Sequence, residues 1–185
     1  MENRRAGFTL LEVSVYITIV LILGAPLTSI FLVSTRSTQD NDTFNKVKER
    51  NRTALFRVET EFRKSIGGTA TIIDYGRGLT FTSTAGFDGT TAIPGPTISY
   101  TFQMDPAEAW DGMDNNGNGL ADEGRLVRRN ATTGEEVVIC SQINVSNSGF
   151  WLMSEGLYIW LTSFAPLSQG GVYSVSRYMT IYPRN

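Results

Sequence analysis

The stretch that decides the fold is Arg4-Arg5-Ala6-Gly7-Phe8-Thr9-Leu10-Leu11-Glu12-Val13, which leads into a mainly apolar run that ends near Val33. From Phe8 to Val33 the only charged residue is Glu12. An α-helix rises about 1.5 Å per residue, so about 20 apolar residues cross the hydrocarbon layer of a bilayer. The run therefore predicts a membrane-spanning helix that carries a single carboxylate.

This segment has three interpretations. A cleaved secretory signal peptide would have a shorter apolar core of about 7–15 residues and a small-residue cleavage site, which Leu23-Gly24-Ala25-Pro26 matches weakly. An ordinary membrane anchor would give Glu12 no purpose. In the third interpretation, the basic leader Met1–Gly7 and the following Phe-Thr-Leu-Leu-Glu resemble the prepilins, which are the precursors of type IV pilins and type II secretion pseudopilins.

That resemblance implies specific processing. A membrane aspartyl peptidase, the prepilin peptidase, would cut after Gly7 and methylate the new amino group of Phe8. Arg4 and Arg5 would hold the leader in the cytoplasm, so the rest of the chain would lie outside the bacterial inner membrane.

The resemblance also gives Glu12 a role in filament assembly, in subunit recruitment and register. Its carboxylate would pair with the Phe8 ammonium group of a neighbouring subunit, because a buried carboxylate is tolerated when it is paired. The alternative is that Glu12 extends to the cytoplasmic interface and has no partner subunit.

The periodicity of the chain defines its segments. Apolar residues recur every three or four positions from Phe44 to Ile66, which predicts a helix with one buried face that ends at Gly67-Gly68. Pro26 predicts a kink or loosened turn in the helix before it. We expect a leader at 1–7, a membrane and assembly half of the helix at 8–33, an amphipathic half at 34–66 and a head at 67–185.

The head changes to a period of two residues, which is typical of β-strands. The candidate strands are Ala70–Asp74, Leu79–Ser83, Thr97–Met104, Gly124–Arg129, Val137–Gln142, Leu157–Ser163 and Val172–Tyr182. Loop-forming residues separate them, notably in Thr84–Pro96 and Ser146–Gly149, and Phe150–Met153 is expected in the core rather than on a binding surface. The predicted fold class is α+β and pilin-like, with a long N-terminal membrane-spanning helix packed on an antiparallel sheet.

A second motif lies in the head at 111–123. Oxygen-bearing residues alternate in it around a glycine turn, in the manner of a calcium-binding loop. The candidate ligands are Asp111, Asp114, Asn116, Asn118, the Leu120 carbonyl, Asp122 and Glu123. The motif resembles the loops of dockerins and thrombospondin type 3 repeats, although Arg125 stands where an EF-hand has its glutamate. An Asn- and Gly-rich turn without a metal is the alternative.

Composition restricts the chemistry. The 185 residues include no histidine, which excludes histidine-based catalysis and histidine metal sites, and one cysteine, Cys140, which cannot form an internal disulfide. Acidic residues outnumber arginines after Ile66, so direct nucleic-acid binding by the head is not expected. The acidic loop could serve a metal-dependent hydrolase, but we expect no enzyme.

The order of the head strands and the ending Thr180-Ile-Tyr-Pro-Arg-Asn185 resemble J-type pseudopilins and W-type minor pilins. A major pilin is the competing assignment within the family. The expected function is a minor pilin-like subunit, near the tip of a pseudopilus or pilus, whose partners are prepilin peptidase and other pilins. A membrane-anchored, calcium-dependent adhesin that does not assemble is the alternative.

Overall fold

The computed structural model describes residues 9–154 and 156–182. Its elements form two compact units, residues 1–41 and residues 42–185, and the helix α1 (Leu10–Phe62) contributes to both. The strands are β1 (Thr71–Ile73), β2 (Gly78–Asp88), β3 (Thr91–Met104), β4 (Glu123–Asn130), β5 (Glu136–Asn144), β6 (Gly149–Met153), β7 (Gly156–Pro166) and β8 (Val172–Ile181). Two short 3-10 helices, η1 (Asp74–Gly76) and η2 (Val145–Asn147), complete the fold.

In the first unit, α1 is long and apolar enough to cross a membrane. Its large apolar side chains between Leu10 and Val33 are all exposed. The helix continues through Pro26 without a break, so the loosened turn expected there is not found. The hydroxyls of Thr28 and Ser29 donate to the carbonyls of Gly24 and Ala25, which helps to satisfy the backbone around the proline.

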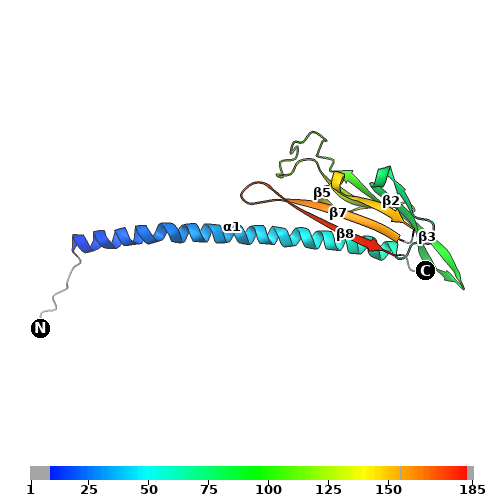
Figure 1. Cartoon of the computed structure of the whole chain (residues 1–185), viewed down its shortest axis with the longest axis horizontal. Coiled ribbons are helices and arrows are strands. Elements are labelled where there is room, and N and C mark those ends of the chain that lie inside the picture. Colours follow the sequence, from blue (N-terminus) through cyan, green and yellow to red (C-terminus); the bar gives the residue numbers. More distant parts are fainter. Residues whose placement is uncertain (1–8, 155, 183–185) are drawn as a thin grey trace. The chain divides into compact units, whose positions relative to one another are not determined.

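In the second unit, an eight-stranded antiparallel sheet has the order β1-β2-β3-β4-β5-β7-β6, and β8 pairs with β7. Figure 1 shows β7 and β8 side by side, in orange and red. Because β7 pairs with β6 through residues 156–160 and with β8 through residues 157–166, these two neighbours occupy opposite edges of β7.

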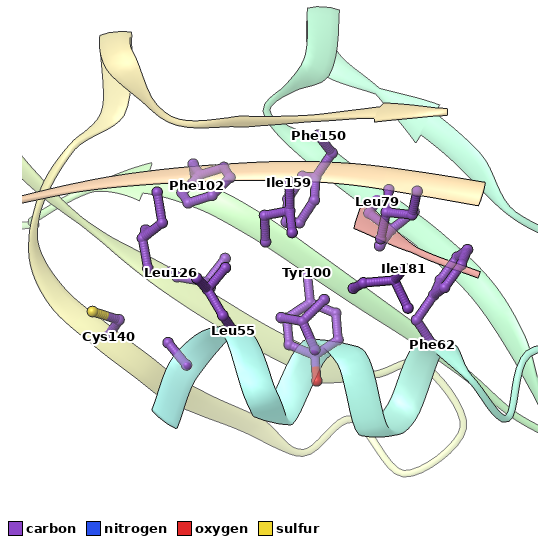
Figure 2. Packing of buried hydrophobic residues seen from close by; sticks show 14 of the residues in the cluster. Leu55, Phe62, Leu79, Tyr100, Phe102, Leu126, Cys140, Phe150, Ile159 and Ile181 are labelled. Carbon is purple, nitrogen blue, oxygen red and sulfur yellow. The ribbon is translucent and has the colours of Figure 1, made fainter. Parts of the chain in front are cut away.

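The core of the second unit forms between this sheet and one face of the C-terminal part of α1. The buried helix residues are Val47, Asn51, Ala54, Leu55, Val58 and Phe62. In Figure 2, Leu55 and Phe62 of the helix face side chains of the sheet that include Tyr100, Ile159 and Ile181. This arrangement confirms the predicted α+β class, in which a long apolar N-terminal helix precedes an antiparallel sheet domain.

All of the predicted strands are present, but three predictions about their surroundings are wrong. The helix ends at Phe62, before Gly67-Gly68, because the following residues join the sheet: the Ile66 amide donates to the Thr82 carbonyl and the Thr84 amide to the Lys64 carbonyl. The predicted loop Thr84–Pro96 is largely a hairpin, since β2 and β3 continue to Asp88 and from Thr91.

The third wrong prediction concerns Phe150–Met153, which forms β6 and has two faces. Phe150 is fully buried against Phe102, with ring centroids 4.9 Å apart, whereas Trp151 is 65% exposed. The alternation of a strand therefore places half of this segment on the surface.

Candidate functional site

The first candidate site is the start of α1, where Glu12 binds back to Thr9. Glu12 Oε2 accepts from the Thr9 amide and from the Thr9 hydroxyl, both at 2.9 Å, and the Glu12 amide lies 3.3 Å from Thr9 Oγ1. This reciprocal pattern is a capping box, which satisfies amide groups that have no partner within the helix. Glu12 therefore caps its own helix in addition to any role toward another subunit.

The sequence motif Thr-x-x-Glu is the signal for such a capping box, and the prediction for Glu12, which rests on its charge, does not include it. The predicted processing residues Gly7 and Phe8 lie outside the described residues. The pairing of Glu12 with the ammonium group of a neighbour remains a prediction.

The second candidate site is the acidic loop between β3 and β4, in which Asp114 organises the backbone. Asp114 Oδ1 accepts from the amides of Gly117 and Asn118, and Oδ2 accepts from the Gly119 amide at 2.7 Å. These amide donors, Gly119 first, hold the pKa of the Asp114 carboxyl below its ordinary value. Gly117 and Gly119 have φ angles of 74° and 86°, which favour glycine, so the turn depends on both of them.

Glu123 is the buried end of this loop. Its side chain is 2% exposed, and the amide nitrogens of Asn116 and Asn118 both donate to its Oε1 atom. Its Oε2 atom is buried and has no hydrogen-bond partner. The side chain of Leu120 is also buried and anchors the loop to the head. A carboxylate oxygen without a donor is costly in such a place, so Glu123 is suited to a cation.

Asp111 and Asp122 close the base of the loop. Asp122 Oδ1 accepts from the amides of Asp111 and Gly112, each at 3.1 Å, and Asp111 Oδ1 accepts from the Met113 amide. The structure thus brings Asn116, Asn118 and Glu123 together. The other candidate carboxylates, those of Asp111, Asp114 and Asp122, accept hydrogen bonds from backbone amides instead. Within residues 9–154 and 156–182, no group of three or more Cys, Asp or Glu side chains is arranged to hold a metal ion.

A calcium site built from these residues would therefore rely on neutral oxygens around Glu123. The side-chain oxygen of Asn116 accepts a hydrogen bond from the Asn118 amide at 3.0 Å, and that of Asn118 accepts one from the Leu120 amide at 2.9 Å. Each oxygen has a second lone pair that a cation could use. An Asn side chain can also exchange its oxygen and nitrogen positions by a half-turn, so the same residues fit either a donor or a ligand role. The residues suit a hard cation in type, and calcium binding stays a prediction.

A polar cluster between helix and sheet was not predicted. Glu61 accepts from Arg128 on β4 and from the hydroxyl of Tyr100 on β3. The only indication of this cluster in the sequence is the helical periodicity, which places Glu61 beside the buried residues Val58 and Phe62. The cluster fixes the position of α1 on the sheet and offers no reactive group toward solvent.

Comparison with known proteins supports the interpretation of the N-terminal segment. The prokaryotic N-terminal methylation motif matches residues 3–28. No curated protein and no solved structure gives a match. The match indicates a type IV pilin-like precursor that prepilin peptidase processes, and the single apolar helix is consistent with the single-pass membrane anchor typical of pilins.

Proposed function

We propose that this protein is a minor pilin-like subunit of a type II secretion pseudopilus or a type IV pilus. The observation that carries the proposal is the methylation motif at residues 3–28, placed on a helix whose apolar side chains are exposed from Leu10 to Val33. Such a surface needs either lipid or other apolar helices around it, and a filament of packed pilin helices supplies the second.

Glu12 supports assembly rather than plain anchoring. A carboxylate within an apolar helix requires a compensating partner, and Thr9 provides neutral hydrogen-bond donors but no positive charge. The cleaved amino group of Phe8 on a neighbouring subunit would provide that charge. The head would then be carried at or near the filament tip, as the resemblance to J-type and W-type subunits implies.

The acidic loop would bind calcium outside the inner membrane and stiffen the head. The buried Glu123 with its unpartnered oxygen is the feature that supports this part of the proposal. Two neutral asparagines in the ligand set favour a modest affinity, suited to extracellular calcium levels. The alternative remains a membrane-anchored, calcium-dependent adhesin that keeps its leader and stays outside any filament.

The test distinguishes two roles of Glu12, which are capping its own helix and neutralising the ammonium group of a neighbouring subunit. The chain is expressed in its natural host as wild type, Glu12→Ala, Glu12→Gln and Gly7→Leu, and an antibody against the head follows it in membrane and sheared-filament fractions. Gln can replace Glu in a capping box, whereas it cannot neutralise an ammonium group. We expect Gly7→Leu to remain as the longer precursor, and both Glu12 variants to be processed but lost from filaments.

Two results would contradict the proposal. Wild-type protein that keeps its leader and never co-purifies with other pilins would favour the adhesin. Glu12→Gln that enters filaments as wild type does, while Glu12→Ala does not, would limit Glu12 to capping its own helix.

A further inference from the structure

The outer face of β6, β7 and β8 carries a row of aromatic side chains, which we call the aromatic face: Trp151, Tyr158, Trp160 and Tyr178. Trp151 pairs across strands with Tyr158, and Trp160 pairs with Tyr178. The residues that alternate with Tyr158 and Trp160 along β7, Leu157 and Ile159, are fully buried in the core. The alternation of the strands therefore points the aromatic face away from α1 and toward solvent.

The four rings of the aromatic face differ in exposure: Trp151 and Tyr178 are exposed, whereas Tyr158 and Trp160 are half-buried. The ring centroids of Tyr158 and Trp160 are 5.8 Å apart at an interplanar angle of 33°, and those of Tyr158 and Tyr178 are 6.3 Å apart at 29°. Trp151 is 65% exposed and Tyr178 is 75% exposed. Isolated exposed aromatics are common on proteins, but an ordered row of them on a sheet is an unusual surface.

Trp160 is held in place by a glycine on the neighbouring strand. A Cβ atom on Gly149 would lie 2.6 Å from the Trp160 ring, so the indole occupies the space that a side chain would fill. This packing prevents the ring from turning freely and gives the aromatic face a rigid centre.

A polar pocket of about 430 Å³ adjoins the same ring. Trp160 lines it together with Asp74, Arg77 and Ser146, whose side chains supply hydrogen-bond donors and acceptors. Asp74 and the fully exposed Tyr75, which also lines the pocket, have φ angles of 51° and 52°, an uncommon conformation for residues other than glycine. Strained backbone of this kind occurs preferentially at binding sites.

The aromatic face is uncharged. In the described part of the chain, the outward positions of the three strands hold only aromatic, hydroxyl-bearing or apolar residues: Gly149, Trp151, Met153, Gly156, Tyr158, Trp160, Thr162, Phe164, Pro166, Val172, Ser174, Ser176, Tyr178 and Thr180. Single-stranded nucleic acid would need a groove of cations along the stacking rings, whereas the pocket beside Trp160 has the acidic Asp74 as well as Arg77 in its lining.

We propose that the aromatic face binds an uncharged, extended glycan such as a β-1,4-linked chain. The C–H groups on the flat side of a sugar ring carry partial positive charge and meet the negative faces of aromatic rings. Sugar hydroxyls at the edges would bond to the phenol groups and to the polar pocket beside Trp160. The row of rings matches a ribbon-like chain in which successive sugars present their flat sides.

The test uses the full-length chain, purified in a detergent without a sugar headgroup, and titrates it with chitohexaose and, separately, with cellohexaose. Intrinsic fluorescence reports binding directly because two of the three tryptophans lie on this face. We expect a saturable change with at least one oligosaccharide, and at least a tenfold loss of affinity in Trp151→Ala and in Tyr178→Ala. Both positions are exposed, so circular dichroism melting should stay unchanged.

Phe56→Ala is the matched control, since Phe56 is also exposed but lies on α1, and it should bind as wild type does. The absence of a saturable change with either oligosaccharide at millimolar concentration would overturn the proposal. A change that persists in both Trp151→Ala and Tyr178→Ala would overturn it too. Loss of the Trp151→Ala chain from filaments without glycan binding by wild type would identify the face as a subunit contact instead.

Discussion

Glu61 of α1 and Arg128 of β4 form an ion pair that joins the helix to the sheet. The Nε atom of Arg128 lies 2.9 Å from Oε1 and 2.8 Å from Oε2 of Glu61. The side chains are 13% exposed for Arg128 and 23% exposed for Glu61, so water screens the pair only in part. The hydroxyl of Tyr100 donates to the same carboxylate at 2.8 Å. Three groups from three elements thereby fix one register of α1 on the sheet.

Glu61→Ala should lower the stability of the head measurably. The change leaves the Arg128 guanidinium and the Tyr100 hydroxyl without their acceptor, and hydrogen bonds to charged groups contribute about 1.5–3 kcal/mol each. Urea unfolding of a fragment of residues 34–185 measures the effect. Glu49→Ala is the control, because the Glu49–Arg52 pair is 67% and 73% exposed and should change stability by no more than about 1 kcal/mol. Equal effects of the two changes would contradict a structural role for Glu61.

Tyr100 should make the head sensitive to alkali. Burial first, and then the charge of Glu61, raise the pKa of the Tyr100 hydroxyl above its ordinary value. Because the unfolded chain ionises near pH 10 and the folded chain does not, the stability from this group is fully present below about pH 10 and is lost as pH rises further. Melting temperature measured from pH 7 to 11 should fall more steeply in wild type than in Tyr100→Phe above pH 10. If the melting temperatures of wild type and Tyr100→Phe fell equally with pH, Tyr100 would not contribute to the alkali sensitivity of the head.

Asn51 should hold α1 to β7 and β8 from within the core. It is fully buried, its Oδ1 accepts from the Ser163 hydroxyl at 2.5 Å, and its Nδ2 lies 3.4 Å from the Val175 carbonyl. Asn51→Ala would leave both groups unsatisfied and cost on the order of 2 kcal/mol or more. Cys140, the only cysteine, lies 3.8 Å from the same oxygen and reports the change.

Thiol labelling of Cys140 is therefore the measurement for Asn51. Burial raises the pKa of the Cys140 thiol, so the folded head should react slowly and wild-type labelling should follow unfolding. Asn51→Ala should speed the labelling at least tenfold, and Thr60→Ala, on the exposed side of the helix, should not. Fast labelling of the wild type would mean that the core around Cys140 opens readily.

The sequence predicted most of the fold because its two periodicities are clear. The apolar run after Phe8 and the three- and four-residue spacing around Val58 define the helix, and the strands of the head alternate. The helix end was not predictable from Gly67-Gly68, because the chain is diverted earlier by pairing of residues near Ile66 with β2. That pairing is a long-range interaction, and local propensity carries no information about it.

The candidate sites were predicted less completely. The sequence predicted Asp114 only as a calcium ligand, and it did not indicate that this carboxylate accepts the backbone amides of the loop. Whether a side-chain oxygen faces a metal ion or a backbone amide depends on the direction of the side chain. The alternation of oxygen-bearing residues along the loop does not specify that direction. The aromatic face was missed because Trp151 and Tyr178 come from different hairpins, and only the strand register brings them together.

Calcium should stabilise the head through Glu123. Binding to the folded state alone raises stability by RT ln(1 + [L]/Kd), which is about 2.7 kcal/mol at a hundredfold excess over Kd. The fragment of residues 34–185 should therefore melt at a higher temperature in calcium chloride than in excess chelator. Glu123→Gln keeps the size of the buried side chain but removes its charge, so it should abolish most of the calcium-dependent shift. Asp88→Asn, in the β2–β3 hairpin, should retain the shift. A melting temperature that is the same with calcium and with chelator would identify the loop as a turn held by Asp114 and its amides, with the Glu123 carboxylate bound only by the two asparagines.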